Sequence, residues 1–198
     1  ADGVLPADDT RFASLVEDVG VLSRLVDDLQ ELAVAEAGRL RYERAPFDVC
    51  EVVAAESERA RSVAAPGVDV RVKCGAPAVL VTGDRFRIGQ VVRNLLSNAV
   101  RHTAAGSITA EVIAQGEWVR VTITDTGEGI APADLPYIWE RFYRADTARA
   151  AETGGTGVGL AIARRIVTDH GGTVFASSKP GQETMVGFEL PCEGAQAD

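Results

Sequence analysis

The sequence predicts an α+β domain, with a mixed or antiparallel sheet covered by helices on one face, behind a long separate helix. Three observations support this fold class. Strand-like and helix-like segments after residue 45 do not alternate strictly, as they would in a doubly wound fold. Residues 107–114 and 118–125 form a predicted hairpin around Gln115-Gly116. Before residue 40, apolar side chains recur every three or four positions, which is the spacing of a helix.

The first predicted element is a helix over residues 10–40, with Thr10 as its N-cap and Gly38 at its end. Its apolar residues follow one another in alternating steps of four and three, as in a coiled coil or helical bundle. They are Leu15, Val19, Leu22, Val26, Leu29 and Ala33. A single helix cannot bury this stripe alone. It packs either on the rest of the chain or, as its length favours, on helices of a second chain.

A linker over residues 41–49 follows, in which Pro46 imposes extended geometry before a short strand. The next predicted elements are a helix over 50–65, strands over 68–72 and 78–83, a helix over 84–101, and the hairpin. Residues 131–156 are irregular. A helix over 159–170 and strands over 172–177 and 184–190 complete the chain. The helix over 84–101 is strongly amphipathic, with Ile88, Val91, Val92, Leu95, Leu96 and Ala99 on its apolar face.

Composition excludes several classes of protein. The chain has 198 residues and a net charge of −9, of which residues 1–40 contribute −6. So acidic a chain is a poor candidate for nucleic-acid binding, although the nearly balanced remainder can bind an anion locally. No apolar run approaches the roughly 20 residues of a membrane-spanning helix, and the first residues do not resemble a signal peptide. The three widely spaced cysteines predict neither a disulfide framework nor a C-x-x-C metal site.

Three segments carry candidate chemistry, and the first lies on the helix over 84–101. Asn94, Asn98 and Arg101 share one face of that helix because they are spaced by four and three residues. An amide oxygen suits Mg²⁺ where phosphates supply the negative charge, and a guanidinium holds phosphate through its planar fork. The alternative is an ordinary solvated polar face.

The other two segments are rich in glycine. In Asp125-Thr126-Gly127-Glu128-Gly129-Ile130, directly after a strand, the glycines permit a tight turn and close approach of a flat ligand. Asp125 can accept hydrogen bonds from an amino group such as that of adenine. Residues 153–160 open a helix with serial glycines, whose N–H groups can cradle phosphate. No Lys-Ser/Thr follows, so this is not a Walker A loop. A simple glycine-rich turn is the alternative for both segments.

In this order the three segments resemble the ATP-binding domain of sensor histidine kinases, within the superfamily shared with gyrase, mismatch-repair and heat-shock chaperone ATPases. The resemblance runs from about Phe47 to Leu190 and includes an F-box-like Ile138-Trp139-Glu140-Arg141-Phe142-Tyr143-Arg144. It implies a two-layer α/β sandwich of the Bergerat type over residues 45–198. Residues 1–44 resemble part of the dimerisation and histidine-phosphotransfer bundle, namely its second helix.

The resemblance implies ATP and Mg²⁺ as cofactors and gives roles to individual residues. Asn98 matches the Mg²⁺ ligand, Arg101 and His102 match residues along the phosphates, and Asp125 matches the residue that reads adenine. Residues 131–156 match the ATP lid, with Arg144 as a candidate γ-phosphate contact. The implied catalytic set is Asn94, Asn98, Arg101 and Arg144. The remaining nucleotide contacts are Gly127, Gly129, Ile130, Phe142, Tyr143, Gly155, Thr156, Gly157, Val158, Gly159, Leu160 and Thr184.

Four positions bear on the resemblance. Related ATPases carry at position 94 a Glu that activates water, and the amide of Asn94 has no useful basicity, which favours transfer to another acceptor over hydrolysis. Neither histidine has the surroundings of the family's phosphoacceptor, which is followed by Glu or Asp. His102 lies inside the first segment, and His170 ends a helix, where we expect it to interact with the helix dipole. Glu183 stands where a second glycine is usual.

The implied function is that of a protein histidine kinase fragment. It would transfer the γ-phosphoryl group of ATP to a histidine outside this sequence, and thence to an aspartate of a response-regulator receiver domain. The intact protein would form a homodimer through the bundle, and this part would be the cytoplasmic portion of a membrane-anchored sensor. We expect the first bundle helix to be lost, by excision or naturally. The alternatives are a nucleotide-sensing module without catalysis and a gyrase-like ATPase.

Overall fold

The computed structural model describes residues 19, 20, 26, 30, 41–75, 78–144 and 156–192. Of the helix predicted over residues 10–40, the four described positions are helical. The remainder of that helix, including the predicted cap at Thr10 and end at Gly38, lies outside the described residues. The same holds for residues 145–155 of the predicted lid.

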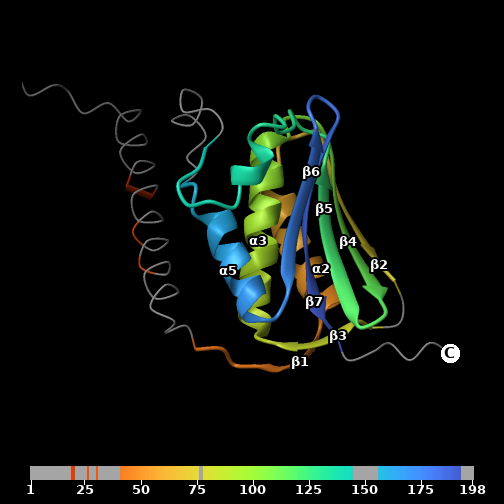
Figure 1. The fold of residues 1–198 in the computed structure, drawn as a ribbon. Helices are drawn as coiled ribbons and strands as arrows, with labels where there is room; N and C mark the ends of the chain where they lie inside the picture. Colours follow the sequence, from red (N-terminus) through yellow and green to blue (C-terminus); the bar gives the residue numbers. More distant parts are fainter. Residues whose placement is uncertain are drawn as a thin grey trace, which may run out of the picture.

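The described part of the chain forms one layer of strands and one layer of helices (Figure 1). The five-stranded sheet has the order β2 (Val68–Cys74), β4 (Gly106–Gln115), β5 (Trp118–Asp125), β7 (Glu183–Pro191) and β6 (Thr173–Lys179). β2 and β4 run parallel and all other neighbours run antiparallel, so the sheet is mixed, as predicted. The predicted hairpin is confirmed, with Gln115 opposite Trp118. A separate antiparallel pair joins β1 (Ala45–Asp48) to β3 (Leu80–Gly83).

Three helices cover one face of the sheet: α2 (Val49–Val63), α3 (Arg85–His102) and α5 (Gly159–Asp169). α3 packs between α2 and α5, and a short 3₁₀ helix, η1 (Leu135–Tyr137), contacts β6. The strands alternate as a one-sided sheet requires, so that Ile108, Ala110 and Val112 of β4 are buried beneath the helices. The predicted apolar face of α3 is buried as well. The two-layer α/β prediction is therefore confirmed.

Aspartate side chains fix where the first two helices begin. Asp48 accepts a hydrogen bond from the Cys50 N–H at 2.9 Å, and Asp84 accepts one from the Arg87 N–H at 3.0 Å. Each carboxylate thereby satisfies a backbone donor that a helix start leaves without a partner. Asp84 is the one residue between β3 and α3, so the cap lies directly at the end of the β1–β3 pair.

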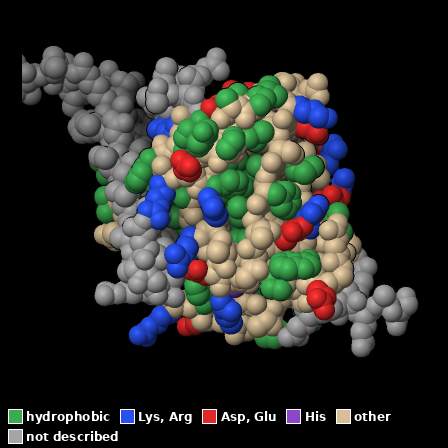
Figure 2. Space-filling model, viewed as in Figure 1, with side chains coloured by type: hydrophobic (Ala, Val, Ile, Leu, Met, Phe, Trp, Pro, Cys, Tyr) green, Lys and Arg blue, Asp and Glu red, His purple; other side chains and the backbone are tan. Residues whose placement is uncertain are grey.

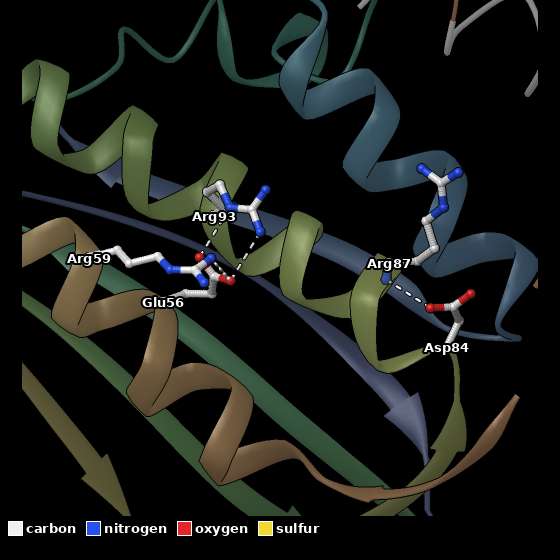
Figure 3. A network of polar contacts seen from close by, with 5 residues as sticks. All are labelled: Glu56, Arg59, Asp84, Arg87 and Arg93. Carbon is white, nitrogen blue, oxygen red and sulfur yellow. Dashed lines mark hydrogen bonds and ion pairs between the residues drawn. The ribbon is translucent and has the colours of Figure 1, made fainter. Parts of the chain in front are cut away.

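A buried carboxylate joins α2 to α3 (Figure 3). Glu56 on α2 is only 7% exposed and accepts two hydrogen bonds from Arg93 on α3, both at 3.1 Å. Arg59, one turn further along α2, adds a third at 3.0 Å. A fork-like pair of this kind fixes one orientation of the two side chains. The contact fixes α3 against α2 at Arg93, the residue that directly precedes Asn94.

The structure corrects the role expected for His170. The ring is buried, its Nδ1–H donates to the Ile166 carbonyl at 2.7 Å, and its Nε2 accepts the Asp84 N–H at 3.0 Å. A ring with this pair of bonds is neutral. Burial also lowers the pKa of His170, because it disfavours the charged ring. His170 is the C-cap residue of α5, and its backbone N–H donates to the Ile166 carbonyl at 3.1 Å. Because its ring is neutral, it is not a cationic partner of the helix dipole.

All three cysteines are free thiols. Among the described residues, no helix combines the length and the apolar character needed to span a membrane.

Candidate nucleotide-binding site

The first candidate segment lies on the last two turns of α3. Asn94 is half-buried, and its Nδ2 donates to the Gly159 carbonyl at 2.8 Å, which ties α3 to the first residue of α5. Asn98 is also half-buried, but its side chain makes no hydrogen bond within the described part of the chain. Arg101 and His102 are exposed at the helix end. The two amides thus differ: Asn94 joins α3 to α5, whereas the side-chain oxygen of Asn98 remains available to a ligand.

Asp125 is the last residue of β5, and it is 4% exposed. One carboxylate oxygen accepts the Gly127 N–H at 2.9 Å. Burial raises the pKa of Asp125, and the Gly127 bond and the nearby His102 partly oppose that shift. Its cross-strand neighbour on β7 is Thr184, which is equally buried. Asp125, predicted to read adenine, and Thr184, a predicted nucleotide contact, are therefore brought together at one end of the sheet.

The two glycines after Asp125 stand where no side chain fits. A Cβ at position 127 would lie 2.1 Å from the His102 carbonyl oxygen. A Cβ at position 129, where φ is +82°, would lie 2.6 Å from the Cα of Pro180. The loop is consequently pressed between the end of α3 and the β6–β7 turn, where the Gly181 N–H donates to the Glu128 carbonyl at 2.9 Å.

Two residues of this region were not predicted from the sequence. Glu128 Oε1 lies 2.7 Å from Nδ1 of His102 and pairs with it. Ser178 on β6 accepts the Ile130 N–H at 2.9 Å, and its Oγ lies 3.0 Å from that of Thr184. Ser178 and Thr184 are cross-strand partners on β6 and β7. A turn placed at residues 180–182 of the sequence would have predicted this pair. Glu183 lies opposite Lys179 in the register of β6 and β7, so its presence does not displace Thr184.

Phe142, within the predicted lid, meets Gly157, which directly follows the lid. The Phe142 N–H donates to the Gly157 carbonyl at 2.9 Å, and both residues have positive φ, +60° and +71°. A side chain at position 157 would crowd Phe142, with its Cβ 3.0 Å from the Phe142 Cα. The Tyr143 hydroxyl donates to Asp134 at 2.6 Å, and this bond raises its pKa to about 12. Arg144 is half-buried next to it, and Gly155 lies outside the described residues.

The glycine-rich segment leads into α5 as predicted. Val158 is fully buried as the N-cap residue, and its N–H lies 3.4 Å from the Thr156 hydroxyl. Leu160, half-buried, lies in the first turn. This helix start presents backbone donors beside Asn94, as an anion site requires. On the face shown in Figure 2, basic side chains gather over α5 and the neighbouring part of α3, although the whole chain is acidic.

Comparisons with known proteins agree with this geometry. Residues 83–194 match the model of a family described as histidine kinase-, DNA gyrase B-, and HSP90-like ATPase. The signal transduction histidine-protein kinase BaeS of Escherichia coli (strain K12) is 36% identical over 195 residues, which are 97% of this chain and 41% of BaeS. The probable sensor histidine kinase TcrY of Mycobacterium tuberculosis is 38% identical over 188 residues, 94% of this chain and 38% of TcrY. The chain thus spans about two fifths of these relatives.

Solved structures show the same likeness. Full-length ShkA in complex with AMPPNP superposes with a TM-score of 0.79 at 29% identity, covering 98% of this chain and 41% of ShkA. The Acinetobacter baumannii histidine kinase AdeS gives a TM-score of 0.77 at 28% identity, covering 98% of this chain and 89% of that structure. With its family match, its sensor-kinase relatives and its glycine-lined Asp125 site, the chain belongs to the histidine kinase-, DNA gyrase B- and HSP90-like ATPase family.

Proposed function

We propose that this chain is the ATP-binding core of a sensor histidine kinase and that the site around Asp125 holds the nucleotide. The observation that carries the proposal is the buried Asp125 carboxylate, which lies opposite the buried Thr184 and has Gly127 pressed against the end of α3. A buried carboxylate that keeps an oxygen for a ligand recognises an amino group, and the adenine ring carries one. Ser178, bonded to Thr184 and to the Ile130 N–H, would support the same ring.

The phosphates would lie between α3 and the start of α5. The unengaged amide of Asn98 fits a Mg²⁺ ion, which would neutralise phosphate charge when bound. Arg101 and His102 would lie along the phosphates, and Gly155, Thr156, Gly157, Val158, Gly159 and Leu160 would offer backbone N–H groups. Phe142 and Tyr143 would shape the lid, and Arg144 would reach the γ-phosphate. In such a site catalysis is mostly positioning and charge stabilisation.

The names of the relatives support a role for the whole protein. The γ-phosphoryl group would pass to a histidine of a bundle helix, and then to an aspartate of a response-regulator receiver domain. Residues 1–44 would be part of that bundle and would form a homodimer in the intact protein, with residues 45–198 as the catalytic domain. This part would be the cytoplasmic portion of a membrane-anchored sensor.

The test is nucleotide titration of Asp125→Asn and Asn98→Ala. Asp125→Asn replaces an acceptor with a donor facing the adenine amino group, so ATP binding should be lost. Asn98→Ala should weaken binding with Mg²⁺ more than binding without it. Asp69→Asn, on strand β2, is the matched control, because Asp69 is exposed and, among the described residues, its side chain pairs with Arg71. Unchanged titrations for both site variants would exclude this site.

Asn94 separates the kinase from a gyrase-like ATPase. Its Nδ2 is held by the Gly159 carbonyl, and an amide cannot take a proton from water. We therefore expect little steady phosphate release from the chain with ATP and Mg²⁺. Phosphorylation of an acceptor-helix polypeptide from a sensor kinase, supplied in trans, separates catalysis from a purely nucleotide-sensing role.

A further inference from the structure

The segment before β1 follows a fixed path although it belongs to no helix or strand. Tyr42 places its ring edge-on to His170, with centroids 4.8 Å apart and planes at 75°. Its hydroxyl donates to Oδ2 of Asp169 at 2.7 Å. Burial and this hydrogen bond raise the pKa of Tyr42, so the hydroxyl keeps its proton and remains a donor.

The next two residues are held at the same place. The Glu43 N–H donates to Oδ2 of Asp84 at 3.0 Å, and the Arg44 guanidinium donates to the Asp169 carbonyl at 2.5 Å. Three consecutive linker residues therefore contact the junction where α5 ends and α3 begins.

The receiving groups are themselves fixed. Asp84 caps α3 with its other oxygen and donates its own N–H to the buried His170 (Figure 3 shows the cap). Asp169 also accepts from Arg165, one turn back on α5, at 2.8 Å. A Cβ at Gly83 would lie 2.9 Å from the His170 ring, so β3 and the end of α5 are tightly packed here. Rigid acceptors of this kind hold a chain in one orientation.

The opposite end of α5 belongs to the nucleotide site. There the Gly159 carbonyl accepts from Asn94, and Gly157 meets Phe142 at the base of the lid. α5 has 11 residues, so about 16 Å of rigid helix separates the linker contacts from the lid. The linker is therefore anchored to the element that carries one side of the site.

We propose that Tyr42, Glu43 and Arg44 form a latch that fixes the ATP-binding domain relative to the chain before it, with Tyr42 as a positioning residue for phosphoryl transfer. The proposal rests on the proposed kinase function. Tyr42 touches no part of the nucleotide site, so it acts through orientation: the latch closed on Asp169 and His170 presents the site to the acceptor, and the latch open does not.

The first experiment measures the latch alone, by trypsin cleavage after Arg41 and Arg44 in the 198-residue chain. Tyr42→Phe keeps the ring on His170 and removes the bond to Asp169, and Asp169→Ala removes the acceptor. Each should speed cleavage about fivefold, since cleavage follows the open fraction. Tyr137→Phe and Asp69→Ala are matched controls and should leave cleavage unchanged. Amide exchange within α3 should stay at the wild-type rate in all four variants, because the domain itself remains folded.

The second experiment measures transfer in the full-length kinase that contains this segment. Tyr42→Phe should lower kcat for histidine phosphorylation about fivefold and leave KM for ATP unchanged. Unchanged cleavage in both latch variants would overturn the proposal, and so would a kcat equal to that of wild type or a KM that moves with kcat. Failure of the wild-type chain to bind ATP would instead refute the proposed function, while cleavage would still report the latch.

Discussion

At the scale of single residues, the buried carboxylate of Asp125 in the proposed binding site lowers the stability of the fold at neutral pH. Burial raises the pKa of this carboxylate, and the Gly127 hydrogen bond and the nearby His102 only partly oppose the shift. A raised pKa means that protonation favours the folded state, so this stabilisation is present below the ordinary pKa of about 4 and is lost as pH rises through the raised value. At neutral pH the domain without nucleotide therefore carries an unfavourable buried charge, and a hydrogen bond from a bound nucleotide would compensate for it.

Asp125→Asn should consequently melt at a higher temperature than wild type at pH 7 without nucleotide, since Asn still accepts the Gly127 N–H. The difference should shrink as pH falls toward 4. Thermal melts of both chains across this range check the prediction. A variant less stable than wild type at pH 7 would show that the carboxylate is stabilising.

His170 should give the opposite dependence. Burial lowers its pKa and Arg44 lowers it further, whereas the Ile166 carbonyl, Asp84 and Asp169 oppose the shift. Its contribution is complete above about pH 6.5 and is lost as pH falls through the lowered pKa. We expect His170→Gln, which keeps an acceptor, to remove this loss. Melting temperatures of the two chains between pH 7.5 and 5 give the comparison, and parallel curves would contradict it.

At the scale of elements, sequence periodicity and turn residues predicted most of the structure. The apolar face of α3, the β4–β5 hairpin and the start of α5 all followed from local pattern. Contacts between elements did not, because they depend on packing that no single segment encodes. The Ser178–Thr184 bond, the Glu128–His102 pair and the neutral state of His170 are of this kind.

The Glu56 contact between α2 and α3 was likewise invisible in the sequence. Glu56→Ala should destabilise the domain by about 2 kcal/mol, less than a fully buried pair, because Arg93 and Arg59 are partly exposed and can reach water. Glu56→Gln keeps one acceptor and should cost less. Urea unfolding of both variants, with Glu58→Ala as the exposed control from the same helix, measures the difference. Equal midpoints for Glu56→Ala and Glu58→Ala would contradict a role for burial.

At the scale of the whole molecule, neither of the two histidines is followed by the Glu or Asp that is expected after a phosphoacceptor. Nδ1 of His102 is paired with Glu128 beside the proposed nucleotide site, and His170 is buried with both ring nitrogens in hydrogen bonds to backbone groups. An acceptor must present a free imidazole nitrogen in line with the γ-phosphate, and His170 lies at the far end of α5 from the lid. His170 does not meet this requirement. In His102, within the described part of the chain, only Nδ1 is paired, and the sequence around it argues against its phosphorylation, because Thr103 stands in place of the Glu or Asp that follows the family's phosphoacceptor.

We therefore expect that this chain, incubated with γ-labelled ATP and Mg²⁺, retains no stable phosphohistidine, although it binds the nucleotide. The same preparation should label an acceptor-helix polypeptide supplied in trans, and Asp125→Asn should abolish that labelling. Acid-labile, base-stable label on the 198-residue chain alone would contradict the expectation. His102→Gln and His170→Gln would then identify the acceptor, because the substitution that removes the label marks the phosphorylated residue.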